Sequence, residues 1–402
     1  MIAIQYLEPS PGIQTLTKAE VTARLRAAFD RLPIDIVIIG WDLPPALVAA
    51  CAHETQRANA QLYLWQPLLT GSNAVQPRTA WRASGLTDEP VSGHHNLPEF
   101  TFLCPNRPAV QAAVMEQLRQ AVRHGPYQGV FLDRLRYPSP LAQPDRDLAC
   151  FCADCRRAAT FDLLEVQRQV RTLLATPDRL CAALRLLFKQ DADLPAELVG
   201  LQQFLDFRTQ SITRSVAVAA QIARKEKLAV GLDCFSPSLT RAVGQDLNAL
   251  DAHCDWIKIM TYGHAFGPAG LPYELSNLAR WLIECRGCNE AATVNEVAQV
   301  AHLPLPPTLS EWRARGLSAE ALSHEVRLAQ AAGVKTLLAG IELVDLEGVT
   351  CLTEAQISAD LRALRAAQPA GLALSWDLWR MPLDRLDLVR TIWNGASMLQ
   401  SK

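Results

Sequence analysis

Hydrophobic residues recur along the chain in eight short runs, and each run ends in polar or turn-forming residues. Most runs are near-continuous rather than alternating, which is typical of parallel strands covered on both faces. The pattern therefore predicts eight buried parallel strands. They span Ile2 to Leu7, Ile34 to Trp41, Gln61 to Gln66, Gly129 to Asp133, Leu228 to Asp233, Trp256 to Tyr262, Lys335 to Ile341 and Gly371 to Trp376.

Amphipathic segments rich in Ala, Leu and Arg separate these runs. Capping-box patterns at Thr17 with Glu20 and at Thr353 with Gln356 mark two helix starts. Eight strand–helix units are the number that closes a barrel, so we expect an α/β fold of the (β/α)8 TIM-barrel class. A doubly wound open sheet is the alternative, but no G-x-G-x-x-G follows the first strand.

Two connections are too long for a simple crossover. The segments 138–227 and 264–333 are therefore predicted as helical insertions after strands four and six, and the first contains a cysteine cluster. A last helix from about Asp384 to Leu399 would seal the closure. We expect one barrel domain over residues 1–402.

The composition of the chain limits the kinds of binding partner and substrate that we expect. Of the 402 residues 49% are hydrophobic and 20% charged, and the formal net charge is −2. This balance gives no basic field for nucleic acid or an anionic membrane, and favours a carbohydrate or another small molecule as substrate. The N-terminus lacks a secretion pattern, and no long apolar stretch follows, so we expect a cytoplasmic protein without a membrane segment. The oligomeric state stays open.

Carboxylates gather at the predicted strand ends. The active site of such a barrel lies at this edge, and like charges raise one another's pKa, so a ring of six acids suggests a function. Helix capping is the alternative for two of them, and an ion pair with a following arginine is the alternative for a third. Glu8 and Asp42 are the two possible helix caps, and Asp133 is the possible ion-pair partner. The other three acids are Asp233, Glu342 and Asp377.

Aromatic and polar residues near the same ends are candidates for substrate binding. Trp65 and Trp376 suit the apolar faces of sugar rings, although rim packing explains them as well. Arg136, Tyr262 and His264 would border the same site. Two carboxyl groups on opposite sides of a bound sugar can cleave a glycosidic bond, one donating a proton and the other attacking or activating water.

Three strings resemble those of glycoside-hydrolase-like TIM barrels, a poorly characterised and distantly chitinase-like group. "GVFLDRLRYPSP" resembles a fourth-strand signature of this group, "DWIKIMTYG" its sixth strand, and "CFCADC" a cysteine cluster of some members. The resemblance implies that Asp133 is a catalytic carboxylate and that Tyr262 lines a sugar subsite. The chitinase run D-x-x-D-x-D-x-E is absent, so it does not imply substrate-assisted cleavage.

The partner of Asp133 remains open between Asp233 and Glu342, and we favour Asp233 because both aspartates stand at the tip of a clean strand. The two carboxyl groups should then lie about 5–5.5 Å apart in a retaining enzyme or about 6.5–9.5 Å apart in an inverting one.

The alternative functions are of two classes. Lys258 shares a strand face with Tyr262, so a buried, activated amine could form a Schiff base in an aldolase-like lyase, although neutralising inner carboxylates explains the lysine too. A catalytically silent carbohydrate-binding barrel would need only one well-placed carboxylate.

Close cysteines suggest a metal. Cys150, Cys152 and Cys155 form C-x-C-x-x-C, and Cys285 with Cys288 forms C-x-x-C in the second insertion. Thiolates at such spacing can hold a structural zinc ion, whereas free packed cysteines are the simpler explanation. The fourth ligand is open. No cofactor is expected to be required for catalysis.

Overall fold

The computed structural model describes residues 1–72, 75–94, 97–123, 125–189, 193–287 and 289–395. Eight strands form a closed barrel in chain order, and each pairs in parallel with its two neighbours, as the hydrophobic runs predicted. Their bounds are β1 (Ile2–Tyr6), β2 (Ile36–Ile39), β3 (Gln61–Pro67), β4 (Gly129–Asp133), β5 (Ala229–Cys234), β6 (Trp256–Ile259), β7 (Leu337–Glu342) and β8 (Gly371–Ser375).

The barrel interior is a cluster of its own, separate from the larger core between strands and helices. Five aromatic side chains fill it together with small and branched residues, and Phe131 stacks on Trp256 at 5.2 Å. The cluster contains Ala3, Ile36, Ile38, Trp41, Tyr63, Trp65, Phe131, Trp256, Leu338 and Ala373. By strand alternation, Gln5, Asp133 and Asp233 point to this same inner side.

Glycines make room for two large inner side chains. A Cβ on Gly231 would lie 2.2 Å from the Trp256 ring, and one on Gly340 would lie 2.7 Å from Cε of Lys258. Both contacts are too close for any side chain. The small residues thus allow an indole and a lysine to fit inside the barrel.

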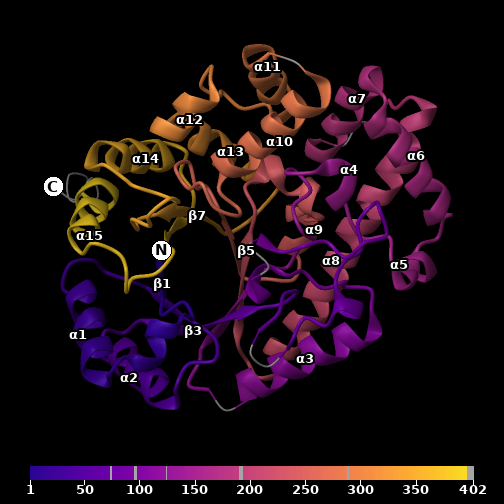
Figure 1. Ribbon diagram of the computed structural model, residues 1–402. Coiled ribbons are helices and arrows are strands. Elements are labelled where there is room, and N and C mark those ends of the chain that lie inside the picture. Colours follow the sequence, from indigo (N-terminus) through magenta and orange to yellow (C-terminus); the bar gives the residue numbers. More distant parts are fainter. Residues whose placement is uncertain (73–74, 95–96, 124, 190–192, 288, 396–402) are drawn as a thin grey trace.

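Helices surround the strands, and in Figure 1 α15 lies between α14 and α1, which closes the ring. The helices are α1 (Lys18–Phe29), α2 (Pro45–Arg57), α3 (Pro108–Arg123), α4 (Pro144–Asp147), α5 (Ala153–Ala158), α6 (Leu163–Ala175), α7 (Pro177–Phe188), α8 (Val199–Lys225), α9 (Leu247–Asp251), α10 (Leu271–Arg286), α11 (Glu290–Ala301), α12 (Leu309–Arg315), α13 (Ala319–Ala331), α14 (Glu354–Ala366) and α15 (Asp384–Val389).

Local sequence signals set several helix ends. Both predicted capping boxes form, so Thr17 begins α1 and Thr353 begins α14. The last helix is shorter than expected: α15 passes into a π-helical turn at Arg390–Asn394. The remainder of that predicted helix lies mostly outside the described residues.

The two long connections contain most of the additional helices. Helices α4 to α8 lie between β4 and β5, and α10 to α13 lie between β6 and β7. In Figure 1, α5, α6 and α7 stand on the outer right side, away from the strands. Helix α7 contacts α11, so the two connections meet.

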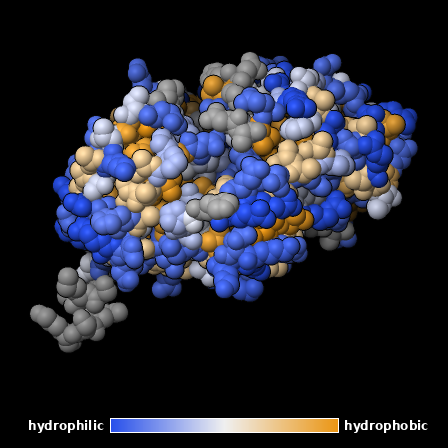
Figure 2. Space-filling view, turned by 90° about the horizontal axis from the view of Figure 1, so that it is seen from below, coloured by the Kyte–Doolittle hydropathy of each residue, from blue (hydrophilic) through white to orange (hydrophobic). Residues whose placement is uncertain are grey.

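Hydrophilic residues cover most of the face shown in Figure 2, and hydrophobic residues appear between them in narrow strips. No helix within the described ranges is both long and apolar enough to cross a membrane.

Candidate active site

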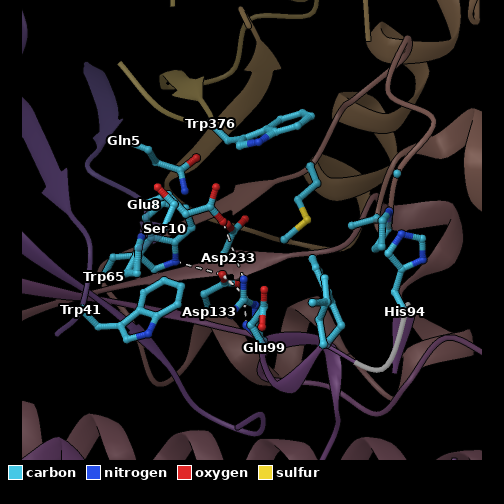
Figure 3. Close-up of a pocket in the computed structure, with 18 of the residues that line it drawn as sticks. Gln5, Glu8, Ser10, Trp41, Trp65, His94, Glu99, Asp133, Asp233 and Trp376 are labelled. Atoms are coloured by element: carbon cyan, nitrogen blue, oxygen red, sulfur yellow. Dashed lines mark hydrogen bonds and ion pairs between the residues drawn. The ribbon is translucent and has the colours of Figure 1, made fainter. Parts of the chain in front are cut away.

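A cavity of about 720 Å³ opens at the carboxyl ends of the strands. Its walls come from β1, β3, β4 and β5 and from the loops that follow the strands (Figure 3). Seven predicted site residues line it: Glu8, Trp65, Asp133, Arg136, Asp233, Tyr262 and Trp376.

Asp133 ends β4 and is 5% exposed. Its Oδ2 accepts a hydrogen bond from Nε1 of Trp65 at 2.9 Å, and its Oδ1 accepts one from the N–H of Arg134 (Figure 3). These N–H groups stabilise negative charge on the carboxylate. The surroundings suit an anion that faces a substrate.

Arg134 links two carboxylates. Its guanidinium lies 3.8 Å from Asp133 and 3.7 Å from Glu8, and it stacks over Trp41 at 5.0 Å. Burial raises the pKa of Glu8 to about 7, although Arg134 opposes the shift. One buried arginine therefore lies close to both the carboxylate that follows β1 and the carboxylate that ends β4.

Asp233 lies next to Asp133, because Leu132 of β4 pairs with Leu232 of β5 and the aspartates follow directly. Its Oδ2 accepts a hydrogen bond from Nζ of Lys258 at 3.0 Å, whereas its buried Oδ1 has no partner among the described residues. Burial raises the pKa of Asp233 to about 7 against the charge of Lys258, and the neighbouring Asp133 adds to the rise. Asp233 can thus carry a proton near neutral pH.

Lys258 lies beneath the cavity and is fully buried. Nζ also donates to Oε1 of Gln5 at 2.9 Å. Burial opposes the charge on Lys258, but the carboxyl group of Asp233 and the hydroxyl group of Tyr262 together outweigh it and raise the pKa of the amine above its usual range. A charged amine that donates hydrogen bonds to Asp233 and Gln5 is a poor nucleophile.

The polar network continues across the barrel. Ser375 donates to the same Gln5 oxygen and accepts a hydrogen bond from the Tyr262 hydroxyl, each at 2.9 Å. The Tyr262 ring lies 5.6 Å from that of Trp376, which is half-buried at the cavity wall. This hydrogen-bond network joins four strands beneath the floor of the cavity, namely β1, β5, β6 and β8.

Arg136 is held between two rings, with Phe102 at 4.1 Å and Phe235 at 4.3 Å. Burial lowers its pKa to about 10, and the carboxyl group of Glu274 opposes the shift. The sandwich fixes the guanidinium at the cavity edge.

Five predicted residues lie outside the lining. Asp42 is exposed, and Lys258 is under the floor. The other three, His264, Glu342 and Asp377, are buried in contacts with the backbone.

Glu342 ends β7 as Asp133 ends β4, but its Oε1 accepts the backbone N–H of His264 at 2.6 Å. His264 in turn bonds to Asp360 of α14 at 2.9 Å through Nε2. Burial opposes the charge on His264, but Asp360 and Glu342 outweigh it and raise its pKa to about 9. These residues join the end of β7 to the loop after β6 and to the helix layer.

Asp377 has a similar structural role. Its Oδ1 accepts the N–H groups of Leu7 and Trp379 at 2.8 and 3.0 Å, and so holds the end of β1 against the loop after β8.

The cavity also has lining residues that the sequence reasoning did not select, including Gln5, His94, Glu99 and Arg380. Gln5 had a signal, since it is a lone polar residue in an apolar strand run. His94 and Glu99 come from the long loop between β3 and α3, which no local pattern directs toward the cavity. Figure 3 shows Glu99 near Asp133 and His94 on the far wall.

The predicted cysteine cluster is brought together away from the cavity. Cys150, Cys152 and Cys155 are buried and meet a fourth cysteine, Cys104. Cys285 is exposed and takes no part, while Cys288 lies outside the described residues.

Comparisons with known proteins support the fold. The chain is similar to the PgaB (BpsB) glycoside hydrolase domain from Bordetella bronchiseptica, with a TM-score of 0.53 and 12% identity over 99% of this chain and 96% of that one. It is also similar to a β-galactosidase from the psychrophilic Marinomonas ef1, with a TM-score of 0.59 and 9% identity; this chain is covered completely and spans 60% of that one. No protein-family model and no curated protein sequence matches the chain. At such identity the likeness establishes the barrel fold.

Proposed function

We propose that the protein is a glycoside hydrolase that uses Asp133 and Asp233 as its carboxyl pair. One observation carries the proposal: two aspartates lie at the carboxyl ends of adjacent strands, at the floor of one cavity and in surroundings that differ. Paired carboxyl groups with opposite protonation states are what cleavage of a glycosidic bond needs.

The surroundings favour a division of roles. Asp233 has a pKa raised to about 7 by burial and an Oδ1 without a partner among the described residues, so it would donate a proton to the leaving oxygen. Asp133, with N–H donors at both oxygens, would be the carboxylate that attacks the anomeric carbon or activates water. The distance between the two carboxyl groups, which would distinguish a retaining from an inverting enzyme, stays a prediction.

Aromatic walls support a sugar substrate. Trp41, Trp376 and Tyr262 line the cavity beside the carboxylates, and ring faces suit the C–H faces of a pyranose. The two similar structures are named as a glycoside hydrolase domain and a β-galactosidase, which agrees with this class of substrate.

The two alternatives are less well supported. A Schiff-base lyase would need an accessible neutral amine, whereas Lys258 is fully buried and paired with Asp233. A silent binding barrel would not need a second carboxyl group with a raised pKa beside Asp133. Borohydride trapping with carbonyl compounds tests the first alternative.

The experiment is a panel of aryl glycosides and oligosaccharides assayed with the wild type, Asp133→Asn and Asp233→Asn. Asp42→Asn is the matched control, because Asp42 also follows a strand but is exposed outside the cavity. We expect hydrolysis by the wild type and the control only. Substrate binding by all four proteins without turnover by any would indicate the silent barrel instead. A wild type that neither binds nor cleaves any glycan, or aspartate variants as active as the control, would refute the proposed function.

A further inference from the structure

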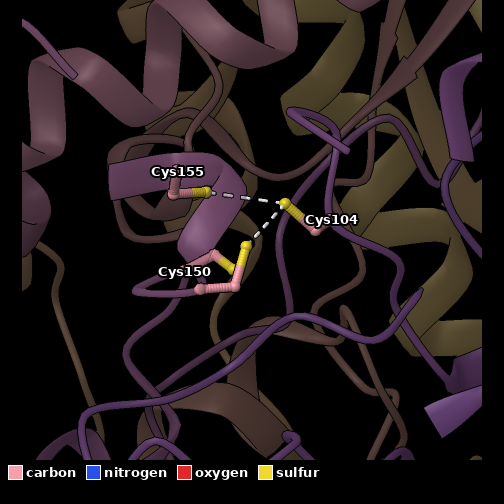
Figure 4. A group of neighbouring side chains, drawn as sticks. Cys104, Cys150 and Cys155 are labelled. Atoms are coloured by element: carbon pink, nitrogen blue, oxygen red, sulfur yellow. Dashed lines mark hydrogen bonds between the residues drawn. The ribbon is translucent and has the colours of Figure 1, made fainter. Parts of the chain in front are cut away.

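The four buried cysteines come from three places in the chain. Cys104 precedes α3, Cys150 and Cys152 follow α4, and Cys155 lies in α5. Figure 4 shows the side chains of Cys155 and Cys104 turned toward each other from separate segments. The ligand atoms of all four lie within 4.8 Å of one another.

The spacing of the sulfur atoms fits a tetrahedral ion better than disulfides. Sγ of Cys104 lies 3.5 Å from Sγ of Cys152 and 3.5 Å from Sγ of Cys155. A disulfide requires about 2.05 Å between sulfur atoms. Four sulfurs at about 2.3 Å from a central zinc would lie roughly 3.8 Å apart, close to the observed separations.

Hydrogen-bond donors are already directed at the sulfur atoms. The backbone N–H of Ser84 donates to Sγ of Cys150 at 3.3 Å, and the side-chain amide of Asn106 donates to Sγ of Cys155 at 3.4 Å. Thiols need no such donors, whereas metal-bound thiolates are commonly stabilised by them.

Arg208 supplies a second, independent observation. It is fully buried in α8, and none of its three guanidinium nitrogens has a hydrogen-bond partner among the described residues. The guanidinium stacks on Tyr137 at 4.9 Å. The Tyr137 hydroxyl accepts a hydrogen bond at 3.4 Å from the Asn106 amide that also donates to Sγ of Cys155, so Arg208 packs beside the cluster. A buried cation without a partner is costly unless an anion lies close by.

We propose that Cys104, Cys150, Cys152 and Cys155 bind one zinc ion as thiolates, and that Arg208 balances the charge of the resulting centre. Binding replaces four S–H protons, which leave to solvent, by four Zn–S bonds. Four thiolates and one divalent cation leave two negative charges, which the cationic side chain of Arg208 would offset. The inference does not depend on the proposed function.

The centre would act as a structural clamp. The β3–α3 loop, which contains Cys104, also carries Leu97, Glu99 and Phe100 in the cavity wall, and Asp133 precedes the segment that reaches Cys150. Zinc would therefore fasten the β3–α3 loop to the first insertion.

Metal content of the full chain, purified without chelator and measured by plasma mass spectrometry, tests the proposal. We expect about one zinc ion per chain in the wild type and less than about a tenth of that in Cys104→Ser and Cys150→Ser. Cys51→Ala is the control, since Cys51 is equally buried but lies in α2. Cobalt added to reduced apoprotein should give the visible absorption of a tetrahedral thiolate site.

Arg208→Met tests the charge balance. We expect its zinc affinity to fall about 10–100-fold, as for other residues that support metal ligands. Arg241→Met is the control, because Arg241 is paired with Asp206 at 3.0 Å. A folded wild type that neither contains zinc nor takes up zinc or cobalt after reduction would overturn the proposal. So would a Cys104→Ser variant that keeps full zinc content, and unchanged affinity in Arg208→Met would overturn the role of Arg208.

Discussion

The ends of β4 and β7 look alike in sequence but differ in use. Each is a buried apolar strand that finishes on a carboxylate, Asp133 or Glu342. At β4 the carboxylate lines a cavity, whereas at β7 it binds the backbone of His264 and lies outside the lining. A strand-end carboxylate is therefore a candidate for catalysis only if the neighbouring loop leaves an oxygen open to substrate.

The largest expected effect is a loss of turnover when Asp133, at the end of β4, is substituted. Asp133→Asn should lower kcat by about 10²–10⁴-fold while the unfolding transition stays near that of the wild type, because the amide keeps the shape of the side chain. Glu342→Gln should keep kcat within about threefold, since Glu342 is expected to support structure only. Steady-state kinetics on the best substrate of the panel measure both. A larger loss of kcat in Glu342→Gln than in Asp133→Asn would reverse the comparison.

Substitutions near the end of β7 should change the stability of the protein rather than its turnover. Asp360→Ala removes the partner of His264, and breaking a buried ion pair costs about 3–5 kcal/mol of unfolding free energy. The folded pKa of His264, about 9, is above its ordinary value of 6.5, so the ion pair stabilises fully below about pH 6.5 and its contribution is lost as pH rises through 9.

Urea unfolding of the wild type and Asp360→Ala at pH 6 and pH 10 measures this dependence. The difference between the two proteins should shrink at the higher pH. His53→Gln is the control, because the side chain of His53 is 70% exposed. An equal difference at both pH values would contradict the role of the His264 charge.

A change under the cavity floor should alter the pH dependence of activity. Lys258→Met removes the cation that lowers the pKa of Asp233, so that pKa should rise further above about 7. If Asp233 acts as the acid, the alkaline limb of kcat/KM should move upward by about one pH unit. A pH–rate profile measures the shift, and an alkaline limb that stays in place would exclude Asp233 as its origin.

The smallest effect concerns the aromatic wall. Trp376→Ala should raise KM about three- to tenfold with little change in kcat, as expected for one lost ring contact. Trp379→Ala is the matched control, because Trp379 is half-buried close by but does not line the cavity. Equal KM values in the two variants would contradict a sugar-stacking role for Trp376.

The sequence by itself determined the strands, their order and the local helix starts. Burial on both faces requires apolar runs, and the Thr17 and Thr353 caps involve residues three positions apart, so both signals are local. The ends of the apolar runs are local signals too, and they predicted that Asp133 and Asp233 lie at the tips of adjacent strands.

Only the tertiary structure decided which side chains meet. Lys258 reaches Gln5 across 253 positions, Cys104 joins Cys155 across 51, and Glu342 turns to His264 across 78. No periodicity encodes such contacts, because they depend on how the barrel closes and on the paths of its long loops. The chain thus specifies the ring of strand-end carboxylates, and the packing of its loops selects which of them face a substrate.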